Sequence, residues 1–142
     1  MWKFEYRRPT TAPPAEVWRL WSDIARWPEW DVDLEAVTLD GEFRAGASGT
    51  LQPRGMDAFP FTITAAEPGT GYADETPLDG AVLRFEHEIV PAEAGNEIRQ
   101  RVIVEGPAAS DYFEEFARQI ILDIPAALGR LAAVAEGRPG DG

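Results

Sequence analysis

The sequence predicts an α+β fold in which a curved antiparallel sheet of about six to seven strands wraps around a long C-terminal helix. Apolar residues alternate with polar ones near the N-terminus and between 34 and 105, which is typical of strands with one buried face. Tight turn signals separate these segments, so consecutive strands should pair antiparallel, because parallel pairs need a long crossover. After 110, apolar residues recur at helical spacing instead. A twisted sheet can curl around such a helix and bury its apolar face.

The chain begins with a predicted strand and a short helical region. In 2–7, aromatic side chains alternate with charged ones. The prolines of 10–14 break this strand and suit the first turn of a helix, where the missing proline N–H is not needed. Residues 17–24 then carry an apolar face at spacings of three and four. Trp27-Pro28 should end this helix or a second short helical turn, because a residue before proline disfavours helix.

Six further segments are predicted as strands. Each is a run of alternating or branched residues bounded by turns that contain glycine, proline or aspartate. In the third of them, Phe59, Phe61, Ile63 and Ala65 are expected on a single face. The six segments cover 34–39, 46–54, 59–65, 72–75, 83–89 and 98–104.

A long helix closes the predicted fold. Its apolar positions recur from 113 to 135, and Ser110 or Asp111 can cap its first turn. Over 111–136 the helix would span about 39 Å at 1.5 Å per residue. Pro125 cannot donate a backbone hydrogen bond, so we expect a kink there and not an end.

Length and charge limit the classes of function. The chain has 142 residues, which suits one domain with a sizeable core. Twenty-five acidic and 13 basic residues give a net charge of −12. Phosphate groups repel so acidic a protein, so we expect no nucleic-acid partner and no docking to anionic membranes. The absence of cysteine excludes disulfides, thiolate zinc sites and cysteine nucleophiles.

No targeting or membrane segment is evident. Residues 1–8 lack the apolar region of a signal peptide, and no apolar run approaches the roughly 20 residues that a membrane span needs. These features indicate a cytoplasmic protein. We expect a single domain over 1–137, a flexible tail over 138–142, and a monomer or a homodimer.

Two parts of the chain resemble a known superfamily. Residues 12–18 read Ala-Pro-Pro-Ala-Glu-Val-Trp and 27–30 read Trp-Pro-Glu-Trp. This pair resembles the opening signature of START-like, Bet v 1-like (SRPBCC) proteins, in particular the polyketide cyclase/dehydrase and lipid-transport branch. The closing stretches at 124–128 and 131–136 are similar to the last helix of that branch. The resemblance implies a helix-grip fold, with a cavity between sheet and helix for a lipid, a sterol, a plant-hormone-like compound or a polyketide.

His87 and Gln100 are the candidate polar groups of such a cavity. Alternation places His87 on the inward face of its strand and Gln100 on the inward face of the next. A hairpin turn near Gly95 would bring them close, although not necessarily directly opposite. Two interpretations stay open: they orient a ligand, with His87 also able to act as an acid or base, or they satisfy one another in a packed core.

Aromatic residues are candidates for the apolar wall of the cavity, although aromatic stripes at these spacings usually form core. The resemblance makes Trp30 a packing residue near the entrance. The wall candidates are Phe59, Phe61, Phe85, Phe113, Phe116 and Tyr112.

Metal and cofactor sites are not predicted. The acidic residues between 23 and 35 lack the spacing of a calcium loop, so we interpret them as solvated surface. No phosphate-binding glycine loop and no nucleophile motif occurs. Glycine and proline blur the strand register near Arg54, Tyr72 and Asp74, so the facing of these three residues stays open. The acidic residues are Asp23, Glu29, Asp31, Asp33 and Glu35.

The leading hypothesis is a domain that binds a small hydrophobic or amphipathic ligand. Burial of apolar ligand surface would supply the affinity, at about 25 cal/mol per Å². One alternative is a cyclase, aromatase or dehydratase that folds a reactive chain in the same cavity, with His87 as a weak catalytic candidate. Another is a partner-binding protein with a closed core.

Overall fold

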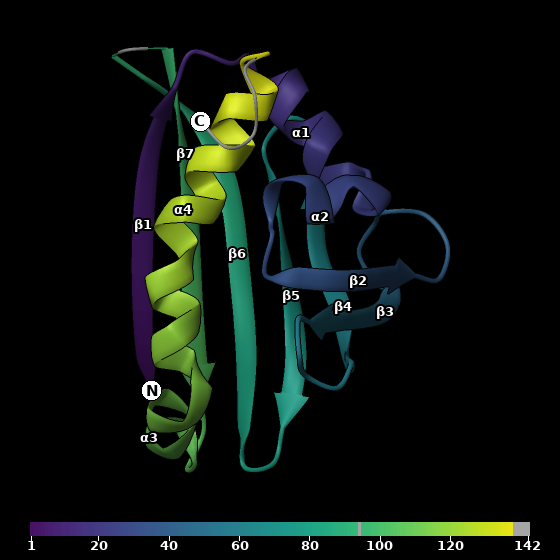
Figure 1. Ribbon diagram of the computed structural model, residues 1–142, viewed down its shortest axis with the longest axis vertical. Helices are drawn as coiled ribbons and strands as arrows, with labels where there is room; N and C mark the ends of the chain where they lie inside the picture. The colour runs from purple at the N-terminus through teal and green to yellow at the C-terminus, as the bar shows by residue number, and fades with distance from the viewer. Residues whose placement is uncertain (94, 138–142) are drawn as a thin grey trace.

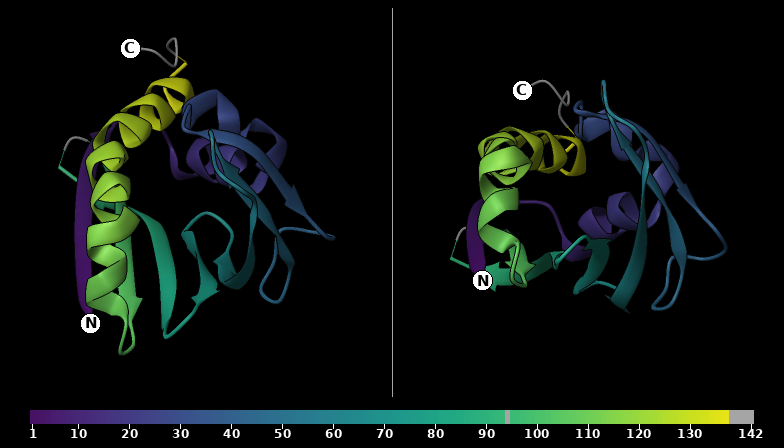
Figure 2. Two further views of the ribbon diagram at one scale, coloured as in Figure 1. Left: turned by 60° about the horizontal axis from the view of Figure 1, so that its bottom comes forward. Right: turned by 90° about the horizontal axis from the view of Figure 1, so that it is seen from below.

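The computed structural model describes residues 1–93 and 95–137, apart from the side chains of Phe116 and Ala117 (Figure 1). Its strands form one antiparallel sheet in the order β1-β7-β6-β5-β4-β3-β2, with helices on one face (Figure 2). This arrangement confirms the predicted α+β helix-grip architecture. The strands are β1 Trp2–Thr10, β2 Leu34–Leu39, β3 Ser48–Pro53, β4 Phe59–Glu67, β5 Gly71–Leu78, β6 Ala81–Ala92 and β7 Gly95–Glu105.

The helices after β1 form as their prolines allow. Helix α1 (Pro14–Ser22) has proline in its first turn, and it buries Val17, Leu20 and Trp21. A 3₁₀ turn (Ile24–Arg26) leads into α2 (Trp27–Trp30). The second short turn does end directly before Trp27-Pro28, as expected, but a new helix begins there, because Pro28 lies in the first turn of α2, where no N–H is needed.

The C-terminal helix has three parts: α3 (Ala109–Tyr112), a π-helical turn (Phe113–Ala117) and α4 (Arg118–Ala135). The predicted cap is wrong, because Ala108 occupies the N-cap without a side-chain hydrogen bond. Figure 2 shows that the helix changes direction along its length, and Pro125 lies inside α4, as expected for a proline kink. No described helix has both the length and the apolar run that a bilayer crossing requires. The predicted tail, 138–142, lies outside the described residues.

The sheet register fixes which side chains face the helices. On β7, β6 and β5, Gln100, His87 and Tyr72 lie directly opposite one another in one row, and Phe85 lies opposite Asp74 in the next. These residues all face inward, toward the helices, and this inner side of the curved sheet is called the concave face below. Buried neighbours such as Leu83 and Val102 extend the same face.

A β-bulge in β4 corrects one expectation. The register with β5 shifts between Ile63 and Ala65, so Ala66, and not Ala65, lies opposite Tyr72. Ala65 therefore faces outward and is exposed, contrary to the prediction that it shares a face with Phe61 and Ile63. A bulge inserts one residue, and because side chains alternate along a strand, everything beyond it changes face.

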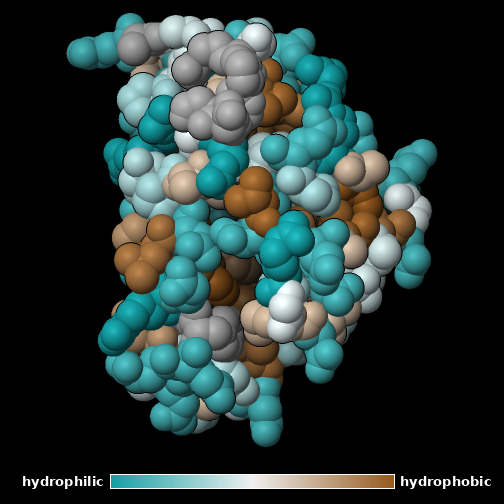
Figure 3. Space-filling model, viewed as in Figure 1, coloured by the Kyte–Doolittle hydropathy of each residue, from teal (hydrophilic) through white to brown (hydrophobic). Residues whose placement is uncertain are grey.

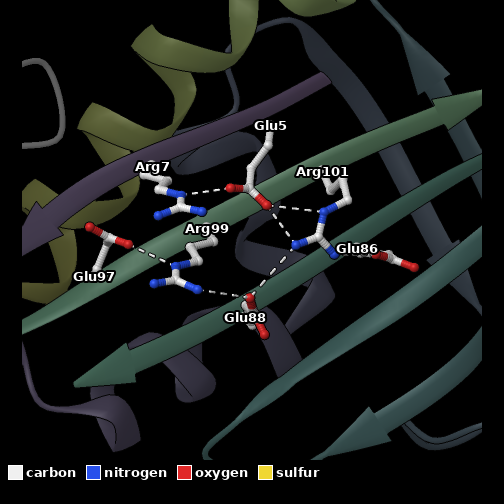
Figure 4. A network of polar contacts seen from close by, with 7 residues as sticks. All are labelled: Glu5, Arg7, Glu86, Glu88, Glu97, Arg99 and Arg101. Carbon is white, nitrogen blue, oxygen red and sulfur yellow. Dashed lines mark hydrogen bonds and ion pairs between the residues drawn. The ribbon is translucent and has the colours of Figure 1, made fainter. Parts of the chain in front are cut away.

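The outer, convex face of β1, β7 and β6 carries a network of ion pairs (Figure 4). Arg101 is central to it, because its guanidinium lies 2.6 Å from both Glu5 and Glu86. Arg99 contacts Glu97 at 2.7 Å. These alternating charges satisfy one another across strands and keep this side of the sheet in water.

Candidate functional site

Three polar side chains are buried on the concave face of β5 and β6. The exposed fractions of Asp74, Thr76 and His87 are 3%, 2% and 9%. Within the described residues, Asp74 Oδ1, Thr76 Oγ1 and His87 Nδ1 are buried without a hydrogen-bond partner. An unsatisfied buried polar atom costs about 1–3 kcal/mol, so three on one face require an explanation.

His87 is held by aromatic rings. Its ring stacks on Tyr72, with centroids 4.2 Å apart and planes 7° apart, and the Tyr72 hydroxyl lies 3.4 Å from His87 Nε2. The ring of Trp21 meets His87 edge-on at 6.0 Å. Burial lowers the pKa of His87 to about 3, against the smaller raising effect of a hydrogen bond with the backbone of Tyr72. His87 is therefore a neutral imidazole near pH 7.

The direction of the contact between the Tyr72 hydroxyl and His87 Nε2 depends on which His87 nitrogen carries the proton. Burial, and then the nearby carboxyls of Asp74 and Asp31, raise the pKa of Tyr72 well above its ordinary value, so the phenol keeps its proton. If that proton is donated to His87 Nε2, the neutral ring must carry its own proton on Nδ1. This assignment follows from the hydrogen-bond partners and leaves Nδ1–H as a free donor.

Asp74 is a buried carboxyl without a counter-ion. No lysine or arginine nitrogen lies within 4.0 Å of it in the part of the chain that the structure describes. Burial, and to a lesser degree the charge of Glu75, raise the pKa of Asp74 to about 8. Asp74 is thus mainly a neutral carboxylic acid at pH 7, with one O–H donor and one carbonyl acceptor.

Aromatic side chains close one end of the concave face. Trp27 stacks on Tyr72 at 6.0 Å and donates its indole N–H to the Trp21 carbonyl oxygen at 2.8 Å. Phe43, from the loop between β2 and β3, meets the Tyr72 ring edge-on at 5.0 Å. Trp30 is buried and packs on Trp27 at 6.3 Å. The helices after β1 therefore supply an aromatic wall beside His87.

The structure brings four of the sequence-predicted site residues together: Trp30 in the aromatic wall, and three on the sheet. His87, Gln100 and Phe85 share the concave face, and Gln100 lies directly opposite His87. The side-chain hydrogen bond of His87 nevertheless goes to Tyr72 on the other neighbouring strand. Phe85 is half-buried, and its ring centroid lies 6.3 Å from that of His87.

The remaining predicted wall residues are spread over the molecule. Phe61 is fully buried in a second cluster with Ala47 and Ile63, and Phe59 precedes it on β4. Phe113 meets Trp2 edge-on at 5.2 Å, near the other end of the fold. The hydroxyl of Tyr112 donates to the Asp79 carbonyl oxygen at 2.8 Å. The side chain of Phe116 lies outside the described residues.

The structure also shows which way the side chains face whose orientation the sequence left open. Tyr72 and Asp74 face inward, whereas Arg54 is exposed and donates to the Val32 carbonyl oxygen at 3.2 Å. Burial and the charge of Asp33 raise the pKa of Asp31 to about 6. Among the described residues, no group of three or more His, Asp or Glu side chains is placed to hold a metal ion.

The described part of the molecule has hollows on more than one side. Figure 3 shows one between the lower part of the C-terminal helix and the β2–β3 hairpin, with hydrophobic atoms inside it. A second, of about 240 Å³, lies on the convex face over Ala65, Gly71 and Ala73, beside Arg99 and Arg101. Both arginines of the convex hollow already pair with glutamates, whereas the unsatisfied polar atoms lie on the concave face, which is therefore the candidate site.

Thr76 is a functional candidate that sequence reasoning missed, whereas Asp74 was named there with its facing left open. Tyr72, Asp74 and Thr76 alternate with Ala73, Glu75 and Pro77, so a period-two signal was present. Proline shortened the predicted strand to 72–75, but β5 continues to Leu78. Phe43 had no comparable signal, because it lies in a loop.

Comparison with solved structures places the fold. StfQ, a di-domain ARO/CYC from the steffimycin biosynthetic pathway, is similar with a TM-score of 0.76 at 14% identity, over 97% of this chain and 52% of its own. Ara h 8.0201 gives a TM-score of 0.68 at 14% identity, over 92% and 97%. Norcoclaurine synthase from Thalictrum flavum, solved with dopamine and hydroxybenzaldehyde, gives 0.67 at 10% identity, over 89% and 83%. At these identities the likeness establishes the fold alone.

Family membership rests on the sequence. None of the curated proteins compared with this chain matches it. The family described as polyketide cyclase/dehydrase and lipid transport matches residues 1–136, which include both stretches that carried the resemblance. The chain therefore belongs to the polyketide cyclase/dehydrase and lipid transport family.

Proposed function

We propose that this protein binds a small amphipathic molecule against the concave face of β5 and β6. The observation that carries the proposal is the set of unpartnered buried atoms on Asp74, Thr76 and His87. A ligand with hydrogen-bonding groups would satisfy them and remove their desolvation cost. Its apolar part would lie against Phe85 and the aromatic residues of α1 and α2, where burial contributes about 25 cal/mol per Å².

Ligands of lipid or polyketide type agree with membership of this family. StfQ is named for aromatase/cyclase activity, and norcoclaurine synthase was solved with two small aromatic compounds. Both support a small-molecule role for this fold. Gln100, opposite His87, would add a further amide to the polar end of the site.

Native mass spectrometry of the purified protein tests this proposal, together with titration of the neutral dye Nile red. We expect a retained small molecule or saturable dye binding. Thr76→Val, which removes only the hydroxyl, should weaken dye binding several-fold, since one hydrogen bond contributes about 1 kcal/mol. Thr64→Val is the matched control, because Thr64 is exposed on β4. An empty, folded protein without saturable dye binding would favour a partner-binding role instead.

A second candidate is an enzyme of cyclase or dehydratase type. Asp74 supports it, because a carboxyl that keeps its proton near neutral pH can act as a general acid. Asp74 would protonate a ketone oxygen as an enol carbon attacks the carbonyl and the enol O–H proton passes to solvent. Alternatively, it would protonate a β-hydroxyl that leaves as water, while a solvent water takes the α-proton and the C–H electron pair forms the new double bond. A β-hydroxy ketone probe should then lose water in the wild type, at a rate that falls above about pH 8, and should be stable with Asp74→Asn.

A further inference from the structure

Inward-facing charge is scarce around Asp74. Its partners across the sheet are Ile63 on β4 and Phe85 on β6, both apolar. The charged neighbours Glu75 and Arg84 pair with each other at 2.9 Å on the convex side of the same strands. Tyr72 and His87, the other titratable groups on this part of the concave face, are both neutral near pH 7.

The arginines on the inner side of the fold lie away from Asp74. Arg8 is on the concave side of β1, three strands from β5, which is roughly 14 Å at the usual strand spacing. Its guanidinium lies against Gly129 of α4. Arg130 of α4 acts on Asp31, a second carboxyl, whose charge contributes to raising the pKa of Tyr72. No described cation is therefore placed to neutralise a negative ligand group at Asp74.

From this arrangement we infer that the concave site selects ligands by charge: it takes an uncharged oxygen acceptor, such as a ketone, and rejects a carboxylate of the same shape. The inference rests on the proposed function and specifies its ligand class. Fatty-acid anions and other carboxylates are excluded by it, whereas ketones, esters and quinones fit.

The physical reason is the balance between donors and desolvation. A ketone oxygen can accept from the Asp74 carboxylic acid, the Thr76 hydroxyl or the His87 Nδ1–H. A carboxylate would lose its hydration without gaining a cation, which costs far more than burying a neutral group. Its charge would also be repelled by Asp31 and Asp74 whenever either is ionised.

Calorimetric titration with two nearly isosteric probes tests the inference: 2-acetonaphthone, an uncharged ketone, and 2-naphthoate, its carboxylate counterpart. At pH 6 we expect the wild-type protein to bind the ketone at least tenfold more tightly. Equal or tighter binding of naphthoate would overturn charge selection while leaving ligand binding intact. Binding of neither probe by a protein folded by circular dichroism would overturn the proposed function together with the inference.

Asp74→Asn separates the role of the carboxyl from shape. Because Asp74 ionises near pH 8, its donor is present in about one molecule in ten at pH 9, so ketone affinity in the wild type should fall by up to about tenfold between pH 6 and pH 9. Asp74→Asn keeps an amide donor at both pH values and should lose this dependence. Asp57→Asn, at an exposed position, should retain it. A pH dependence that persists in Asp74→Asn would assign the selectivity to another group and overturn the inference.

Discussion

Tyr72 and His87 lie face to face across β5 and β6, and the Tyr72 hydroxyl is 3.4 Å from His87 Nε2. This one pair sets two chemical properties of the site. The stacked ring and the surrounding aromatics keep His87 neutral, and a phenol that donates to Nε2 places the imidazole proton on Nδ1. The partner of His87 is thus a residue on the strand before it, and not Gln100 on the strand after it.

Removing His87 should cost stability in two steps. His87→Phe keeps the stack but leaves the Tyr72 hydroxyl unpaired, a loss of about 1–3 kcal/mol. His87→Ala also leaves a cavity, which brings the loss to about 3–5 kcal/mol. Urea unfolding at pH 7 measures both, with Thr64→Ala as an exposed control. Equal stabilities for the Phe and Ala variants would contradict the importance of the stacked ring.

Lowering the pH should reduce the difference in unfolding free energy between the wild type and His87→Phe. The pKa of His87 is about 3 in the folded protein and about 6.5 in an unfolded chain. Between these values the unfolded chain binds a proton that the folded protein does not, so wild-type stability falls as pH drops from 6.5 toward 3. The Phe variant lacks this loss. Unfolding free energies at pH 7 and pH 4.5 check the prediction, and a gap that widens at pH 4.5 would contradict it.

The effect of Asp74 on the pH dependence of stability should be opposite to that of His87. Its pKa is about 8 in the folded protein and about 4 when unfolded, so between these values the folded state holds the extra proton. Wild-type stability therefore falls as pH rises from 4 to 8, by up to about 1.4 kcal/mol per pH unit. Asp74→Asn should gain stability relative to the wild type over that range. Thermal unfolding at pH 5 and pH 8 tests this, with Asp57→Asn as control. Equal changes in melting temperature for both variants would refute the prediction.

Period-two alternation was enough to predict the inward facing of His87, Gln100 and Phe85. Each lies in a long, regular strand whose other face is charged, so a single sequence pattern fixes both faces. The long apolar stripe likewise predicted the C-terminal helix. These features depend on local periodicity, which a sequence displays directly.

Other parts of the site depend on contacts that no local pattern encodes. The β4 bulge moved Ala65 outward, because a single inserted residue reverses the alternation. Pro77 at the end of β5 concealed Thr76, although proline is tolerated near strand ends and edges. The choice of Tyr72 as the partner of His87 required the register of β5 against β6. The π-helical turn at Phe113–Ala117 also had no signal in the spacing.

Arg101 should contribute more to stability than an isolated surface ion pair. It contacts both Glu5 and Glu86 at 2.6 Å, and its side chain is only 33% exposed (Figure 4). Arg101→Ala should cost about 1 kcal/mol at low salt, because it removes the Arg101 contact from Glu86 and one of two arginine contacts from Glu5. At 1 M salt, where screening acts over about 3 Å, the loss should shrink.

Arg19→Ala is the control for the convex network. Arg19 forms a single exposed pair with Glu16 on α1, for which about 0.3–0.5 kcal/mol is expected. Urea unfolding at two salt concentrations compares the variants. If both lose the same free energy, the network contributes no more than its separate pairs.

Two glycines should respond oppositely to alanine. Gly129 lies inside α4, and an added Cβ would meet only the Arg8 guanidinium at an ordinary 3.8 Å. Alanine restricts the unfolded chain and favours helix, so Gly129→Ala should stabilise the protein by about 0.5–1 kcal/mol. At Gly71 the opposite is expected. The Cβ that alanine adds there would overlap the backbone carbonyl oxygen of His87, which cannot move aside. Gly71→Ala should therefore destabilise the protein and displace β5 against β6, beneath the Tyr72–His87 pair. Melting temperatures measure both effects, and a stabilised Gly71→Ala variant would show that the two strands separate more easily than their paired backbone implies.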